Sequence, residues 1–203
     1  SIQKINHLLN KNNITLALLK PIEDHNNHQN PLKQGLRKQK EPAKMPKNNN
    51  INIFDVANYI IVDQKIPNLT NLKIQKLIFY IYAVYLVKTK PPTKMLQAKL
   101  EAWPYGPVFP ELYFALRKFK NTIIIDQPLS VKNPHPIPPL SKSCIEYILQ
   151  KYGNLKAGEL AEKTHDEDPW HDAYVNNIYF EDNKITDQAI FDYYDDQFDD
   201  FKI

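Results

Sequence analysis

Residues 72–87 read LKIQKLIFYIYAVYLV, and this stretch decides the fold. Its first two turns are amphipathic, which predicts that Lys73, Gln75 and Lys76 lie on the solvated face of a helix. From Leu77 to Val87 the stretch is apolar almost all round, which predicts a helix buried at the centre of the domain. This uncharged run is too short to cross a bilayer. We therefore expect a central core helix and no membrane-spanning segment.

Helical patterns continue on both sides of this central stretch. Capping residues, prolines at first helical positions and 3.6-residue periodicity indicate the helix starts. The predicted caps include Asn52, Thr70 or Asn71, and Thr186. Two short segments, Lys99–Trp103 and the β-branched Thr122–Ile125, have the composition of strands. The expected fold is mainly α, a compact bundle of about seven helices with up to two short strands. The other helices are expected at Asn52–Ile61, Pro110–Phe119, Ser141–Tyr152 and Leu155–Thr164, from Asp168, and after Thr186.

The charge is unevenly distributed along the chain. Residues 1–50 hold nine Lys or Arg and three acids, whereas the remainder holds 17 basic and 20 acidic residues. Residues 1–50 contain no Phe, Tyr or Trp. From about Pro21 to Asn50 the chain also has few apolar residues of any kind, so this stretch cannot bury enough surface to offset the entropy of ordering. We interpret residues 1–50 as a flexible, basic, polar arm with a short helical stripe and a linker, and residues 51–203 as the helical domain. A phosphate-binding tail is the alternative, but the lack of aromatic residues does not favour nucleic acid as a partner.

No catalytic motif stands out. With 4 Gly and 1 Cys, the chain offers no phosphate-binding loop, disulfide or Cys-x-x-Cys pair. The densest polar cluster runs from His165 to Asp172, but His165 and His171 would face about 120° apart on a helix. Acidic side chains at the start of a helix stabilise its N-terminus, which explains the cluster without a metal ion. We therefore expect no enzyme, cofactor or metal, and keep a metal-dependent hydrolase at His165 and His171 as a less favoured alternative.

The block Trp103-Pro104-Tyr105-Gly106-Pro107-Val108 offers large aromatic surfaces fixed by two prolines. It is either a rigid corner packed into the core or an anchor for a partner, because preordered aromatic side chains lose little entropy on binding. The same two readings apply to Trp170. The predicted partner-binding residues are Trp103, Tyr105, Pro107, His165 and Trp170.

Five blocks occur in order along the chain and together resemble the Panacea, or SocA-like, antitoxin domain family, which is related to phage-associated GepA-type proteins. The resemblance covers residues 53–199. The blocks are Phe54–Ile60, Leu72–Tyr80, Glu101–Val108 with Pro110–Tyr113, Tyr152-Gly153 with Glu159-Leu160, and Thr164-His165 with Pro169-Trp170.

The resemblance implies a largely helical bacterial, mycoplasma-like or phage protein that neutralises a toxin, usually encoded beside it, by direct binding. It implies no catalytic residues. In one branch of the family the domain also delivers the toxin to a ClpXP-type protease, so a proteolytic adaptor or scaffold is the alternative function. An acidic C-terminal region would complement a basic toxin. The absence of a secretory signal and the lone Cys144 favour the cytoplasm.

Overall fold

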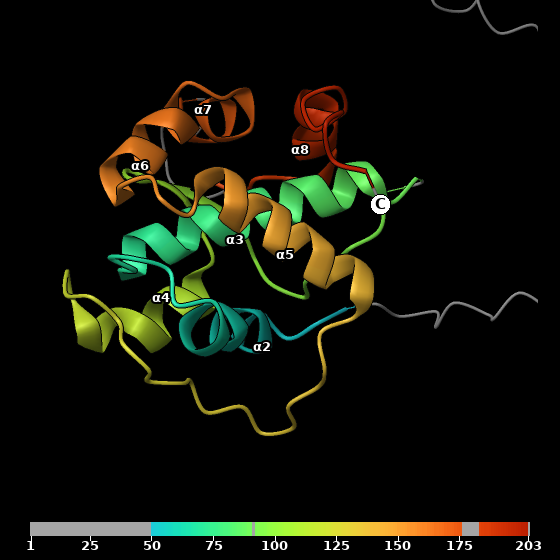
Figure 1. Ribbon diagram of the computed structural model, residues 1–203. Helices are drawn as coiled ribbons and strands as arrows, with labels where there is room; N and C mark the ends of the chain where they lie inside the picture. The colour runs from blue at the N-terminus through green and yellow to red at the C-terminus, as the bar shows by residue number, and fades with distance from the viewer. Residues whose placement is uncertain (1–49, 91, 176–182, 203) are drawn as a thin grey trace, which may run out of the picture. The chain divides into compact units, whose positions relative to one another are not determined.

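The computed structural model describes residues 50–90, 92–175 and 183–202, which form a mainly helical domain (Figure 1). Within these residues seven α-helices and one two-stranded sheet are present, which confirms the expected fold class. The predicted arm, apart from Asn50, lies outside the described residues. The helices are α2 (Ile53–Asn58), α3 (Asn71–Lys88), α4 (Pro110–Leu116), α5 (Pro139–Tyr152), α6 (Ala157–His165), α7 (Asp168–Val175) and α8 (Asp187–Tyr194), and the strands are β1 (Glu101–Trp103) and β2 (Gly106–Val108).

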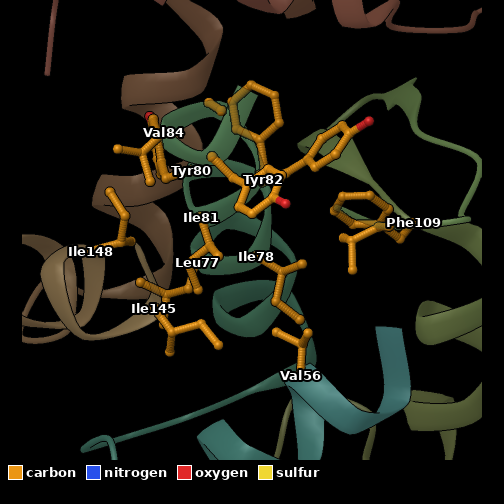
Figure 2. Packing of buried hydrophobic residues seen from close by; sticks show 14 of the residues in the cluster. Val56, Leu77, Ile78, Tyr80, Ile81, Tyr82, Val84, Phe109, Ile145 and Ile148 are labelled. Atoms are coloured by element: carbon orange, nitrogen blue, oxygen red, sulfur yellow. The ribbon is translucent and has the colours of Figure 1, made fainter. Parts of the chain in front are cut away.

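Helix α3 lies at the centre of the domain, as its sequence predicts. It contacts α2, α4, α5, α6, α8 and β2. Every residue from Leu77 to Val87 is buried. Figure 2 shows Ile145 and Ile148 of α5 on one side of α3 and Phe109 on the other. Each large apolar side chain buried in this way contributes roughly 1.5–3 kcal/mol of stability, so α3 is the main support of the fold.

The prediction of a solvated face on the first half of α3 was wrong. Lys73, Gln75 and Lys76 are all buried. The Nζ atom of Lys73 donates to the backbone carbonyls of Pro67 and Gly153, at 2.7 Å each. An amphipathic pattern assigns polar residues to solvent, but a helix enclosed on all sides can bury them when they meet backbone acceptors.

The predicted caps are confirmed at three helices. The side chain of Asn52 accepts from the amide of Phe54 at 2.9 Å, and that of Thr70 from Lys73 at 3.3 Å. The side chain of Thr186 accepts from the amide of Ala189 at 3.1 Å.

Several helix boundaries differ from those expected. Helix α5 begins at Pro139 rather than Ser141, because proline fits the first turn and needs no amide partner. Helix α6 begins at Ala157, with the carboxylate of Glu159 accepting from the Lys156 amide. The first helix ends at Asn58 and continues as a π-helical turn, η1 (Tyr59–Asp63), and a 3₁₀ turn, η2 (Arg117–Phe119), extends α4.

The two strands form an antiparallel hairpin with a turn at Pro104-Tyr105. Its register pairs Glu101 with Val108 and Trp103 with Gly106. The expected strand at Lys99–Trp103 is therefore present, but the expected strand at Thr122–Ile125 was wrong. That segment is not a strand, and the amide of Ile124 donates to the carbonyl of Leu69 instead. Branched side chains favour a strand only where another strand is available to pair.

No helix among the described residues is both long and apolar enough to cross a membrane.

Candidate functional site

The hairpin of β1 and β2 presents aromatic side chains at its tip and depends on one glycine at its base. Tyr105 in the turn is 72% exposed, and Trp103 is half-buried. Gly106 has a φ of +94°, a conformation that side chains rarely adopt. A Cβ atom there would lie 2.5 Å from Oγ1 of Thr164 and 2.8 Å from Cε of Lys76. Only glycine therefore lets the hairpin pack this closely on α3 and α6.

The inner side of the hairpin is held by polar side chains from α3 and α7. The Nζ atom of Lys76 donates to the carbonyl of Pro107 at 2.8 Å. The amide of Phe109, just after β2, donates to Oε1 of Gln75 at 2.9 Å. From α7, Nε1 of Trp170 donates to the carbonyl of Trp103 at 2.9 Å. These three bonds fix both strands to the helical core.

Burial of Lys76 has an electrostatic consequence. Desolvation lowers its pKa from 10.5 to about 7, because the charged form loses its water. His165, at the end of α6, has a lowered pKa because of its own burial and because of the nearby Lys76 charge. The region beneath the hairpin therefore disfavours positive charge.

The outer edge of the hairpin is completed by a segment from near the C-terminus. The amide of Ala102 donates to the carbonyl of Asn183 at 2.7 Å, and the amide of Ile185 donates to the carbonyl of Leu100 at 3.0 Å. Glu101 forms an isolated antiparallel bridge with Lys184. Because both edges of β1 are paired, its backbone is not available to add another strand.

A hollow lies between the hairpin, α4 and the start of α3, and we call it the hairpin groove. Its volume is about 640 Å³. Trp103 and Tyr113 meet edge-on in its wall, with ring centroids 4.9 Å apart. Phe114, 52% exposed, lies beside both rings, at 6.2 Å from Trp103 and 5.5 Å from Tyr113. The residues that line the groove are Asn71, Leu72, Gln75, Trp103, Pro104, Tyr105, Val108, Tyr113, Arg117, Lys120 and Asn121.

The charged residues that line the groove are both cations. Arg117 and Lys120 are exposed, and neither forms an ion pair with a residue in the part of the chain that the structure describes. The guanidinium of Arg117 lies 5.8 Å from the ring centre of Phe114, within range of a cation–π contact. The carboxylate of Glu101 accepts a hydrogen bond from Nε1 of Trp103 at 2.8 Å, so this acid is used to hold the indole ring.

Beneath the hairpin, three rings are stacked. His165 lies on Trp170 with ring centroids 4.1 Å apart, and Trp170 lies on Tyr174 at 4.8 Å. Trp170 is 6% exposed, and Nε2 of His165 is buried without a hydrogen-bond partner among the described residues. The stack supports the carbonyl of Trp103 from below through the Trp170 hydrogen bond, so these residues position the hairpin.

The structure brings the predicted partner-binding residues together around the hairpin but divides them into two groups. Trp103 and Tyr105 line the groove. Pro107 and Trp170 are buried, and His165 is partly buried beneath them. No observation tests contact with a partner, so that role stays a prediction for all five.

Sequence reasoning missed several groove residues and one buried support. Tyr113, Arg117 and Lys120 line the groove from α4 and the turns after it, Phe114 lies beside the rings of Trp103 and Tyr113, and Lys76 lies behind the hairpin. Tyr113 and Lys76 fell within two of the blocks that carry the family resemblance, whereas Phe114, Arg117 and Lys120 carried no motif. The closeness of α4 to the hairpin in the sequence was the one signal that could have pointed to them.

The polar cluster from His165 to Asp172 is also divided. Glu167, 3% exposed, accepts from the hydroxyls of Tyr80 at 2.9 Å and Tyr194 at 2.5 Å, and pairs with Lys163 at 3.0 Å. Burial and the Glu167 charge raise the pKa values of both tyrosines. Glu167 therefore links α3, α6 and α8.

The two histidines of the cluster lie in different helices. His171, in α7, is exposed beside Asp172, whereas His165 ends α6. Across residues 50–90, 92–175 and 183–202, no three His, Cys, Asp or Glu side chains are grouped to hold a metal ion. The described residues therefore give the hydrolase alternative no metal site.

Comparison with known proteins finds a family model that matches the part of the chain containing this hairpin. Residues 74–171 match the family model described as the antitoxin SocA-like, Panacea domain. No curated protein and no solved structure matches the chain. The matched range runs from the first turn of α3 into α7, and so includes the hairpin, α4 and most of the groove lining. Over these residues the chain is similar to the SocA-like Panacea domain family.

Proposed function

We propose that the chain is an antitoxin that neutralises a cognate toxin by direct protein–protein binding, with the hairpin groove as the contact surface. The observation that carries the proposal is an exposed aromatic surface, built on a rigidly held hairpin, within the residues that match a SocA-like antitoxin domain. Trp, Tyr and Arg are the residues that most often dominate binding energy at protein interfaces. A surface fixed before binding loses little entropy when a partner docks.

Binding alone accounts for the proposed activity, and no catalytic group is required. Cys144 is the only cysteine of the chain. It is fully buried, and burial raises the pKa of its thiol to about 12, which suppresses the thiolate that a nucleophile requires. The thiol suits a reducing compartment, and we propose the cytoplasm as the place where the protein meets its toxin.

The acidic C-terminal region stays a second predicted contact for a basic toxin. Several of its acids already have basic neighbours within the domain. Asp195 pairs with Lys90 at 2.8 Å and Asp187 with Lys94 at 3.2 Å. Exposed pairs of this kind contribute little stability, so a basic partner could replace the lysines at small cost.

The experiment is a growth-rescue assay with the product of the neighbouring gene, combined with co-purification. We expect the full chain to restore growth and to bind that product. Tyr105→Ala together with Phe114→Ala should weaken binding at least about tenfold, because the variant removes two exposed aromatic rings from the proposed contact surface. Since both side chains are largely exposed, their removal should leave the fold intact. Ile125→Ala is the matched control, since this apolar side chain is 65% exposed and does not line the groove.

The outcomes test the antitoxin role and the hairpin groove separately. If the full chain neither binds nor rescues, the antitoxin role is wrong. If it rescues and the double variant is as active as the control, the groove is not the contact surface.

Delivery of the toxin to a ClpXP-type protease is the alternative function, with residues 1–50 as the predicted tether. Deleting residues 1–50 tests it. A toxin that persists longer in cells after the deletion, while still bound, would support the adaptor role, and unchanged turnover would remove it.

A further inference from the structure

We infer that the hairpin groove accepts an acidic segment of the partner that carries an apolar side chain. This inference rests on the proposed function, because it names the chemistry of the toxin surface that the groove would bind. It follows from three properties of the groove: its apolar wall, its unpaired cations and the satisfied state of its two buried amide side chains.

The wall provides a place for one apolar side chain. The aromatic rings of Trp103 and Tyr113 face the hollow together with the aliphatic side chains of Leu72 and Val108. A volume of about 640 Å³ is in the range of sites that enclose a ligand group in apolar surroundings. A Leu, Ile, Phe or Trp side chain therefore suits this wall.

The two buried amide side chains in the groove, those of Asn71 and Gln75, are already used by the fold. Asn71 donates to the carbonyl of Tyr113 at 3.2 Å and accepts from Gln75 at 3.3 Å. Gln75 in turn accepts from the amide of Phe109. These groups have little capacity left for a partner, so recognition of polar groups falls to other side chains.

The cations supply that recognition. Arg117 and Lys120 line the groove without an ion pair among the described residues, and exposed Lys118 lies between them in the sequence. The guanidinium of Arg117 has parallel N–H donors that match the two oxygens of a carboxylate. Because the charged lining is entirely cationic, an acidic partner segment is complementary and a basic one is repelled.

Two other occupants fit less well. Residues 1–50 of the chain have nine basic and three acidic residues, so they carry the same sign of charge as the groove. Single-stranded nucleic acid needs a continuous cationic track and ring faces on which bases can stack. Here the rings of Trp103, Tyr113 and Phe114 meet edge-on, with interplanar angles of 64° to 79°, and the cations lie close together in the chain, from Arg117 to Lys120.

Selection of displayed random peptides of roughly twelve residues on the full-length chain tests the inference without knowledge of the toxin. We expect enrichment of Asp and Glu around one large apolar residue. Anisotropy measurements on a labelled selected peptide should show at least about tenfold weaker binding to the Arg117→Gln, Lys120→Gln double variant. Binding should also weaken as salt is added, since both cations are exposed.

A matched control comes from α5. Lys142→Gln removes an exposed cation that also lies over an aromatic ring, that of Tyr59 at 5.5 Å, but does not line the groove. This variant should bind the peptide like the unchanged chain.

Several results would overturn the inference. These are selection of basic or uncharged peptides, selection of none, or peptide binding that the double variant leaves unchanged. Binding of single-stranded oligothymidine that the double variant abolishes would identify nucleic acid as the occupant instead. Self-association that the double variant abolishes would identify a second copy. If acidic peptides bind the groove but the chain fails the rescue assay, the antitoxin proposal fails and the groove chemistry stands.

Discussion

The two halves of α3 are both buried, but they serve different purposes. Residues 77–87 are mostly apolar and form the larger part of α3, which packs against α5, α6 and α8. Residues 71–76 include four buried polar side chains, those of Asn71, Lys73, Gln75 and Lys76. Their donors and acceptors meet backbone groups of the hairpin, of α4 and of nearby loops. The second half holds the domain together, whereas the first half determines where the hairpin groove lies.

The energies of the two kinds of contact support this division. A buried apolar side chain contributes roughly 1.5–3 kcal/mol, whereas an internal hydrogen bond contributes a net of about 0.5–1.5 kcal/mol. A hydrogen bond is directional, however, and an unpaired buried donor is costly. Polar contacts of α3 therefore add little stability but permit few positions for the hairpin.

The largest expected effect is in the apolar half. Phe79→Ala should lower the free energy of unfolding by about 3–5 kcal/mol, because it empties a fully buried site. The ring packs 5.3 Å from that of Tyr80 and 6.1 Å from that of Tyr194. Urea unfolding would measure the change, with Ile125→Ala as an exposed control that should shift stability by less than about 0.5 kcal/mol. A small loss at Phe79 would contradict the assignment of stability to this half.

The next effect concerns pH and the polar half. The pKa of Lys76 is about 7 in the folded protein and 10.5 without burial, so folding disfavours its charged form. This destabilisation is fully present below pH 7 and is lost as the pH rises from about 7 to 10.5. Relative to Lys76→Met, the unchanged chain should gain up to about 1.4 kcal/mol of unfolding free energy per pH unit between pH 7 and 9.

Urea unfolding of both proteins at pH 7, 8 and 9 would measure this difference. Lys142→Met on the exposed side of α5 serves as the control and should show no such trend. Parallel pH profiles for Lys76→Met and the unchanged chain would mean that Lys76 is solvated in solution.

The smallest effect on stability is expected at the hairpin itself. Gly106→Ala forces a side chain into a left-handed backbone conformation and against Thr164 and Lys76, which should cost about 1–3 kcal/mol. Because the hairpin must shift, binding to the partner should fall more than stability. Gly158→Ala in α6 is the matched control, since a Cβ there meets nothing within 4 Å, and should leave the protein unchanged or up to about 1 kcal/mol more stable. Equal binding by both variants would show that hairpin position is unimportant.

The comparison also explains what the sequence could predict. The run from Leu77 to Val87 is apolar all round, and only a buried helix suits such a run, so its place in the core was predictable. Lys73 and Lys76 followed an amphipathic pattern that usually means solvent. Their burial depends on the carbonyls of Gly153 and Pro107, which lie far away in the sequence. Periodicity carries no information about such distant acceptors.

The candidate site divides in the same way. Trp103 and Tyr105 were identifiable because prolines and an aromatic pair stand together in the chain. The groove also needs Tyr113 and Arg117, which are ordinary helix-surface residues in the sequence and become part of it when α4 packs beside the hairpin. At Thr122–Ile125 the sequence predicted an element that is absent. The segment has the composition of a strand but forms none, because no strand in the described part of the chain pairs with it.

The hydrogen bond between Trp170 and the carbonyl of Trp103 has a spectroscopic consequence. These are the only two tryptophans in the chain, so all of its indole fluorescence originates at the hairpin and at the helix that contacts it from beneath. Trp103 lines the groove and should change its emission when the groove is filled, whereas Trp170, 6% exposed, should respond only when the support beneath the hairpin loosens. Single Trp→Phe variants would separate the two signals, so the unlabelled protein can report both docking and hairpin movement.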